Sequence, residues 1–235
     1  EDLFGSAHAQ YQVRHLFAIP RLDVTTVVYR NDFRRNWVKL QSIGGASLTD
    51  VVERPEMFAA ELAIARGADS GPGALMVRHN NRTYYGAGVQ SILGLPLAAG
   101  GARHKLEIGV RYHEDQEDRF QHEDRFQMLR GQMVLTAQGA PGSQSNRVSD
   151  ARAWATFIQD RIEWGRWGLM PGLRYERVNL TRTDYAKTDP SRTSPTMIRE
   201  NFVDVFIPGV GVSFAVSPAV RLFGGVHKGF SPPAP

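Results

Sequence analysis

The chain has 235 residues with 23 glycines, 13 prolines and no cysteine, which excludes a disulfide framework, a thiolate metal site and a cysteine nucleophile. Its net charge of +4 comes from 28 Lys and Arg against 24 Asp and Glu, and the cations form no single run that would indicate a nucleic-acid-binding stripe. No apolar run reaches the roughly 18–20 residues of a membrane helix, so only shorter, alternating strands could cross a bilayer.

Alternation of apolar and polar side chains, which is typical of strands with two different faces, recurs along the chain. In KLEIGVRY (105–112), leucine, isoleucine, valine and tyrosine share one face, while lysine, glutamate, glycine and arginine share the other. The pattern predicts eight extended segments, which are 10–19, 22–37, 82–95, 104–117, 151–164, 167–184, 200–216 and 219–230.

The connections between these segments alternate in length. Short turns are expected at Pro20-Arg21, 96–103, Gly165-Arg166 and Ser217-Pro218, and long polar loops at 38–81, 118–150 and 185–199. In an up-and-down meander, this order places every short turn on one rim and every long loop on the other. Outer-membrane barrels have this arrangement, with short periplasmic turns and long extracellular loops.

Two stretches within the long loops have their own patterns. RFQMLRGQMVLTAQ (125–138) alternates like a strand, but a ninth membrane strand would move the turn at Gly165-Arg166 to the wrong rim. We therefore expect an extracellular hairpin or a strand extension above the membrane. RPEMFAAELAIARG (54–67) predicts a short helix ended by Gly67. Neither stretch indicates a domain boundary.

The segment GRWGLMPGLRYERV (165–178) has a proline on its apolar face. The row from Trp167 to Tyr175 is apolar, whereas the alternate positions carry glycine and, toward the end, charge. Pro171 has no N–H to donate to a neighbouring strand, so a missing ladder hydrogen bond or a small bulge is expected there.

Aromatic residues gather near the ends of the expected strands. They fit the interfacial girdles of a membrane barrel, and equally the core of a soluble sandwich. The length of 167–184 and 200–216 favours the barrel, because strands of soluble sheets usually have about five or six residues. The aromatic residues concerned are Trp37, Tyr84, Tyr85, Tyr112, Trp154, Trp164, Trp167, Tyr175, Phe202 and Phe230.

Several motifs, in order, resemble the TonB-dependent outer-membrane receptors. ATFIQDRIEWGRWGLMPGLRYERV is similar to their strand–turn–strand signature, and VRLFGGVHKGFSPPAP is similar to a later strand. YRNDFRRNWVKL and MVRHNNRTYYGAGVQ, with LAIARG between them, resemble the ferric-citrate-receptor subgroup. The resemblance covers essentially the whole chain.

The resemblance implies a 22-stranded, plug-filled barrel in the outer membrane of a Gram-negative bacterium, which imports ferric chelates with energy supplied through TonB, ExbB and ExbD. About eight membrane strands are expected here. Residues 1–235 are therefore interpreted as part of an all-β, antiparallel barrel domain, an internal fragment without plug or TonB box. Its partners would be a ferric chelate, the TonB complex through the missing plug, and outer-membrane lipid and lipopolysaccharide.

The expected ligand is an anionic chelate of the ferric citrate type, which arginine can hold through bidentate carboxylate contacts and which tyrosine or glutamine can support as donors. Arg82 and Arg119 are preferred because both lie at the outer ends of expected strands. The full set of candidates, at loop bases or on the inward face, is Arg34, Arg35, Arg82, Tyr84, Gln90, Arg111, Arg119 and Arg125.

No catalytic motif is recognisable, so the chain is not expected to be an enzyme or to carry a cofactor. HEDQEDRFQHEDRF (113–126) contains His113, Asp115, His122 and Asp124, but their spacing matches no standard metal site, and a solvated, ion-paired loop is favoured over a metal centre. Two alternatives remain open: a passive porin-like barrel, and a soluble β-sandwich that binds ligand through its loops.

Overall fold

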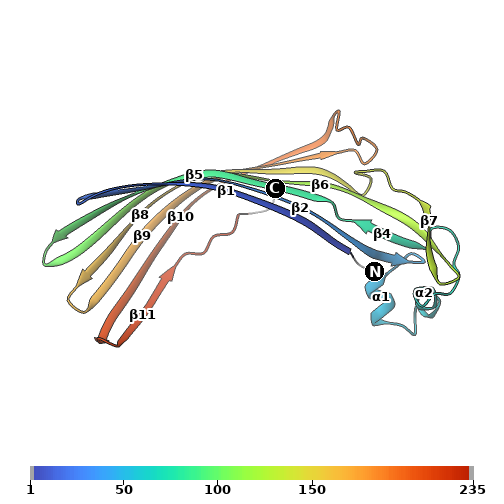
Figure 1. Ribbon diagram of the computed structural model, residues 1–235, viewed down its shortest axis with the longest axis horizontal. Coiled ribbons are helices and arrows are strands. Elements are labelled where there is room, and N and C mark those ends of the chain that lie inside the picture. The colour runs from blue at the N-terminus through green and yellow to red at the C-terminus, as the bar shows by residue number, and fades with distance from the viewer. Residues whose placement is uncertain (1–2, 233–235) are drawn as a thin grey trace.

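The computed structural model describes residues 3–232, which form one curved antiparallel sheet (Figure 1). Neighbouring strands follow one another along the chain, and β4 and β5 lie end to end between β2 and β6. The expected up-and-down fold class is confirmed, and because the described residues form a single sheet, the sandwich alternative is wrong. The strands are β1 (Leu3–Ile19), β2 (Leu22–Ile43), β3 (Ala46–Ser47), β4 (Leu75–His79), β5 (Arg82–Ala99), β6 (Ala102–Leu129), β7 (Gln132–Ala137), β8 (Ser145–Trp164), β9 (Trp167–Tyr185), β10 (Pro195–Ser217) and β11 (Val220–His227).

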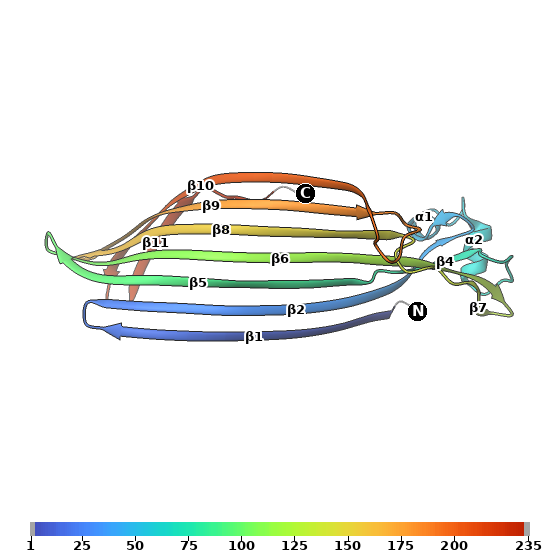
Figure 2. The ribbon, with the colours of Figure 1, turned by 90° about the horizontal axis from the view of Figure 1, so that it is seen from above.

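The two rims of the sheet differ as predicted. Figure 2 shows the tight turns at one end and the long connections, with the helices and β7, at the other. The turn expected over 96–103 is shorter than predicted, because Pro96 still pairs with Lys105 and only Gly100 and Gly101 leave the ladder. Both glycines have positive φ, 58° and 74°, as a two-residue hairpin turn requires. The last turn is likewise shifted by one residue, to Pro218-Ala219.

Most strands extend beyond their predicted ends on the loop side, whereas β5 begins at the predicted residue and β11 ends at His227, before the predicted residue 230. β6 has 28 residues and continues to Leu129, so the whole charged stretch 113–126 lies in a strand rather than a loop. This part of β6 has polar side chains on both faces, so it lacks the alternation of apolar and polar residues from which strands are predicted. Its backbone nevertheless pairs with β4, β5 and β8. The expected hairpin over 125–138 is confirmed as the pairing of β6 with β7.

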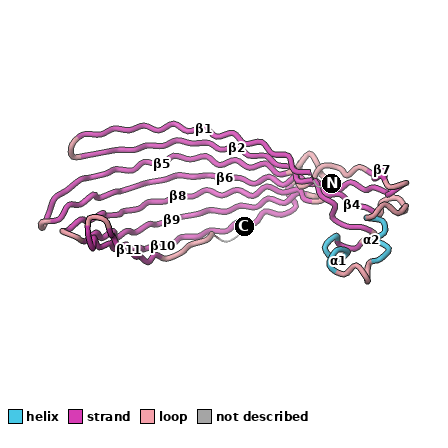
Figure 3. The backbone as a smooth tube through the Cα atoms, turned by 60° about the horizontal axis from the view of Figure 1, so that its bottom comes forward, coloured by secondary structure: helices cyan, strands magenta, loops and turns pink. Residues whose placement is uncertain are grey.

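Two short helices lie at the loop end of the sheet (Figure 3). α2 (Ala59–Ala65) confirms the helix predicted within 54–67. α1 (Leu48–Glu53) was not predicted, although Ser47 caps it by accepting a hydrogen bond from the Asp50 N–H at 3.0 Å. Among the described residues, no helix is long and apolar enough to cross a membrane.

A small hydrophobic core lies beneath these helices. Ile43, Leu75 and Met128 are buried together there, and Ile64 of α2 packs against them. Leu180 of β9 is also buried, but most of the other large apolar side chains are exposed, including Trp164 at 63% and Trp154 at 53%. The sheet therefore leaves most of its apolar side chains uncovered within this chain, and another apolar medium must cover them.

The register assigns every strand residue to one of two faces, because paired residues share a face and neighbours along a strand alternate. We call these the apolar face and the polar face. Tryptophan and tyrosine border the apolar face: Tyr112 packs on Trp154 at 4.9 Å between ring centroids, and Trp167 packs on Phe214 at 4.6 Å. Between these borders, the apolar face includes Val13, Phe17, Val28, Val89, Leu93, Ile108, Val110, Ile158, Leu173 and Val210.

The irregularity expected at Pro171 is confirmed. β8 and β9 pair up to Gln159 with Gly172 and again from Ile162 with Leu169, and the pairing lapses between these positions without a change of register. A missing ladder bond, rather than a bulge, therefore accommodates the proline. Beside it on the apolar face, Asp160 is paired with Nδ1 of His104 at 2.7 Å.

Candidate ligand-binding site

Four arginines lie side by side across the polar face, just beyond the apolar band. Arg35 of β2 pairs with Arg82 of β5, Arg82 with Arg119 of β6, and Arg119 with Arg147 of β8. Directly opposed residues in a sheet have Cβ atoms about 4.5–5.5 Å apart, and like charges at this spacing are destabilising. Such a row needs compensating anions, either from the protein or from a ligand.

Glu117 compensates part of this charge from the next row of the polar face. Its carboxylate accepts hydrogen bonds from Arg82 Nη1 at 3.1 Å and Arg119 Nε at 2.6 Å. Tyr84 donates its hydroxyl to the same carboxylate at 3.1 Å and accepts a bond from Arg35 Nη2 at 3.4 Å. Burial alone would raise the pKa of Glu117, but these bonds and the arginine charges outweigh it and lower the pKa, so the carboxylate stays ionised.

The far end of the row is less well compensated. Burial, together with the charges of Arg119 and Arg182, lowers the pKa of Arg147. Asp184, which pairs with Arg147 in the sheet, is held by Arg182 at 2.7 Å. We call the five residues Arg35, Arg82, Arg119, Arg147 and Arg182 the arginine cluster. With Glu117 and Asp184 as counter-charges, its sum is +5 − 2 = +3.

The arginine cluster also holds donors that no protein group uses. Nε of Arg82 and Nε of Arg147 are buried and have no hydrogen-bond partner among the described residues. A buried donor without a partner is unfavourable, and an anion that accepts from it relieves the cost. Excess positive charge and unused donors together make this part of the polar face suited to a multivalent, oxygen-rich anion.

The structure brings together four of the residues selected from sequence, namely Arg35, Arg82, Tyr84 and Arg119. The other four lie elsewhere. Arg34 is on the continuation of the apolar face, and Arg125 lies six residues beyond Arg119, near the β6–β7 hairpin. Gln90 and Arg111 face each other deeper on the polar face, where the Arg111 guanidinium donates to the Tyr29 hydroxyl at 2.8 Å.

Arg147 and Arg182, which complete the arginine cluster, and its counter-charge Glu117 were not selected from sequence. Arg147 lies in a stretch that was predicted to be a loop, so its alignment with Arg119 could be found only from the pairing of β6 with β8. Once that register is fixed, alternation along β8 and β9 places Arg147 and Arg182 on the same face as Arg119. The missing signal was long-range pairing rather than residue type.

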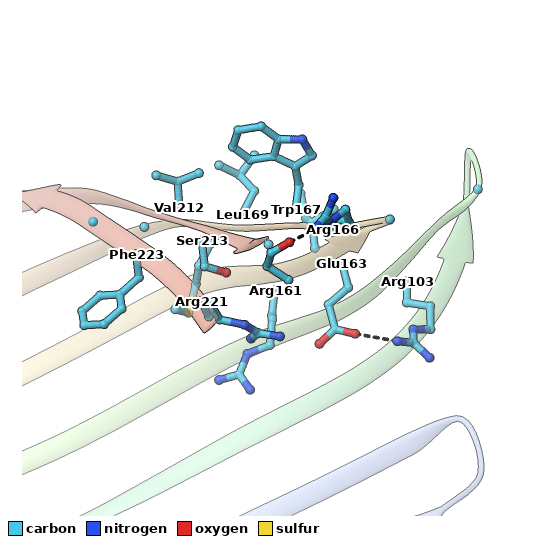
Figure 4. Close-up of a pocket in the computed structure, with 18 residues that line it drawn as sticks. Arg103, Arg161, Glu163, Arg166, Trp167, Leu169, Val212, Ser213, Arg221 and Phe223 are labelled. Atoms are coloured by element: carbon cyan, nitrogen blue, oxygen red, sulfur yellow. Dashed lines mark hydrogen bonds and ion pairs between the residues drawn. The ribbon is translucent and has the colours of Figure 1, made fainter. Parts of the chain in front are cut away.

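A cavity of about 650 Å³ lies at the turn end of the sheet. Figure 4 shows Arg103 paired with Glu163, at 2.9 Å, and Arg166 reaching toward the end of β10, where its Nε donates to the Ala215 carbonyl at 2.7 Å. The first pair is largely exposed, with 82% and 52% of the side chains accessible. These bonds tie neighbouring turns together, and solvent screening leaves them a small energetic role.

Comparison with known proteins agrees with this architecture. Residues 6–235 match the family described as "TonB dependent receptor-like, beta-barrel". Among solved structures, the chain is similar to the ferric citrate transporter FecA in its unliganded form, with a TM-score of 0.63, 15% identity, and coverage of 96% of this chain and 28% of that one.

Two further receptors have the same fold. The ferric-catecholate import receptor Fiu from E. coli K12, in its open form, gives a TM-score of 0.66 at 10% identity, over 99% of this chain and 36% of that one. The siderophore receptor PiuA from Acinetobacter baumannii gives 0.59 at 13% identity, over 92% and 31%. The chain thus spans about a third of the length of the solved receptors it matches.

Proposed function

This chain belongs to the TonB-dependent receptor β-barrel family, and we propose that it forms part of the wall and loops of a receptor that takes up an anionic ferric chelate across the outer membrane of a Gram-negative bacterium. Proteins of this family and fold are receptors and transporters rather than enzymes. The arginine cluster is the observation that carries the choice of ligand.

The chemistry of the arginine cluster fits a carboxylate-rich iron chelate. Ferric citrate-type complexes carry net negative charge and several carboxylate oxygens, which guanidinium groups bind through paired, charge-assisted hydrogen bonds. Arg82 and Arg147 have unused Nε donors, and Tyr84 adds a hydroxyl beside them. Glu117 positions Arg82 and Arg119 without neutralising the cluster.

The apolar face supports a membrane position for the wall. From Trp154 to Trp164, β8 rises ten residues, which at about 3.3 Å per residue and a tilt of about 40° spans about 25 Å, the height of the apolar band in outer-membrane barrels. In this orientation the tight turns face the periplasm and the arginine cluster faces the cell exterior. Charged residues that follow the band, such as Arg152 and Arg177, are placed to meet lipopolysaccharide.

Energy for uptake would come from TonB, ExbB and ExbD through a plug domain in the lumen, as the family implies. The polar face supports a filled lumen because glycines leave room for large neighbours. A Cβ atom on Gly88 would lie 2.5 Å from the Tyr29 hydroxyl, which bonds to His113 Nδ1 at 2.7 Å. Ordered cross-strand bonds of this kind give the plug a rigid wall to pack against.

The proposal is tested by ligand binding to the full-length receptor in detergent. Arg82→Ala and Arg119→Ala should each weaken ferric citrate binding, whereas Arg152→Ala, on the other face of β8, should not. Unchanged affinity in both cluster variants would reject the site. A passive pore would be indicated if uptake by intact cells continued after TonB was removed.

A further inference from the structure

Three side chains that can ligate metal converge outside the arginine cluster. His79 of β4 pairs directly with His122 of β6, and Asp124 lies one pair further along the same face. The two imidazole rings are stacked, with centroids 4.4 Å apart and planes inclined by 10°. His79 Nε2 is 3.0 Å from Asp124 Oδ2, and His122 Nε2 is 3.9 Å from Asp124 Oδ1.

We propose that His79, His122 and Asp124 bind a divalent transition-metal ion of the Zn²⁺ class. Two imidazole nitrogens and a carboxylate oxygen are a donor set that this class prefers. A tetrahedral ion with ligand bonds of about 2.0–2.1 Å holds its donor atoms about 3.3 Å apart. One ligand atom from each residue already lies within 4.8 Å of the others, so modest side-chain rotations close the site.

The surroundings hold the three ligands in place. Asp124 Oδ1 accepts a hydrogen bond from the Gly139 N–H at 2.8 Å, which fixes the carboxylate from the connection between β7 and β8. The side chains of His79, His122 and Asp124 are only 22%, 15% and 12% exposed. Partial exclusion of water strengthens ligation by charged and dipolar groups.

Asn36 of β2 supplies an orienting contact to His79. Its Nδ2 lies 3.5 Å from His79 Nδ1, while its Oδ1 is buried without a partner among the described residues. The two amide atoms are assigned from the hydrogen-bond network, and exchanging them lets Oδ1 accept the Nδ1–H of His79. His79 would then present an unprotonated Nε2, as metal-binding histidines do when a second group holds the other nitrogen.

His122 is prepared for ligation as well. Its Nδ1 is buried and has no partner in the part of the chain that the structure describes. A cavity of about 700 Å³ borders His122 and its neighbour Asn36.

The location separates this ion from the transported chelate. His79, His122 and Asp124 lie on the continuation of the apolar face, whereas the arginine cluster lies on the polar face. The ion would join β4, β6 and, through Gly139, the connection between β7 and β8. It would thus brace the part of the receptor outside the membrane rather than take part in transport.

The test uses the full-length receptor in detergent, stripped with chelator and titrated with Zn²⁺ alone by calorimetry. We expect one saturable equivalent that His79→Ala and His122→Ala weaken at least 100-fold, and that Asn36→Ala weakens about 10-fold. The matched control is His227→Ala, an exposed histidine of β11, which should leave the affinity unchanged. Visible absorption of bound Co²⁺ should appear in the wild type and be absent from the double His79/His122 variant.

Two further measurements keep the result decisive. The variants should retain ferric citrate affinity, which shows that they fold and that the metal site is independent of the proposed function. Zn²⁺ should raise the wild-type unfolding midpoint, since ligands that bind only the native state stabilise it. Absence of saturable Zn²⁺ binding, equal binding by the double variant, or an unshifted wild-type midpoint would each overturn the proposal.

Discussion

Arg34 and Arg35 are adjacent in β2, yet they point to opposite faces of the sheet. Replacing each by alanine therefore tests the position of the ligand with two chemically identical changes. Arg35 belongs to the arginine cluster, and among the described residues its one side-chain hydrogen bond is a 3.4 Å contact with the Tyr84 hydroxyl. Most of its charge is thus available to a bound anion.

The size of the expected effect follows from Coulomb's law. A unit charge about 5 Å from an anion at an effective dielectric constant near 20 contributes about 3 kcal/mol. Remaining water and the other arginines reduce this, so we expect a loss of about 2 kcal/mol, or about 30-fold in Kd, for Arg35→Ala. Arg34, about 12 Å away on the other face of the sheet, contributes about 0.7 kcal/mol at an effective dielectric constant near 40, so Arg34→Ala should change Kd only about threefold.

Both variants are measured in the full-length receptor by calorimetry with ferric citrate, at low and at high ionic strength. The Arg35→Ala deficit should shrink at high salt, since screening weakens the interaction that the wild type retains. Equal losses in the two variants, or a larger loss for Arg34→Ala, would refute the assignment of the ligand to the polar face.

Three other predictions concern stability. Leu173→Arg, in the middle of the apolar face, should cost about 2–4 kcal/mol of folding free energy in a bilayer, measured by denaturant titration; an unchanged midpoint would contradict the lipid-facing assignment. Gly109→Ala should destabilise by about 1–3 kcal/mol because its Cβ would lie 2.1 Å from the opposing phenylalanine of β8, whereas Gly224→Ala, with no atom within 4 Å, should be tolerated. Although burial opposes its ionisation, hydrogen bonds from residues 192–194 lower the pKa of Asp189. Ionised Asp189 stabilises the loop fully above the ordinary carboxyl pKa, and this stabilisation is lost as the pH falls through the lowered pKa. Amide hydrogen exchange in residues 192–194 should therefore accelerate only in strong acid. Asp189→Asn should remove this dependence of the exchange rate on pH.

The strands of the membrane wall could be predicted because they are marked by local patterns in the sequence. Two-residue alternation marks a strand between two media, and the order of short and long connections fixes which rim each turn occupies. Even the interruption at Pro171 followed from a single missing N–H. Such features depend on residues close together in sequence.

The loop end was harder to predict because its structure depends on distant pairing. Charges on both sides of β6 conceal its continuation to Leu129, and β4 exists because β2 and β6 flank it. For the same reason, the sequence alone did not place Arg147 in the arginine cluster. The proposed metal site could not be predicted from residues 113–126 alone, because His79 lies 43 positions before His122 in the sequence. The two histidines meet only through the pairing of β4 with β6.

The core formed by Ile43, Leu75 and Met128 affects which part of the molecule unfolds first. This core, beneath α1 and α2, is stabilised by the hydrophobic effect, because its apolar side chains are removed from water. The wall below it is stabilised by contact with lipid and by the hydrogen bonds between its strands. A denaturant or a mutation can therefore loosen the outer part while the wall stays assembled. The loops at this end can therefore change in sequence without loosening the wall, because burial from water stabilises the outer part and lipid stabilises the wall.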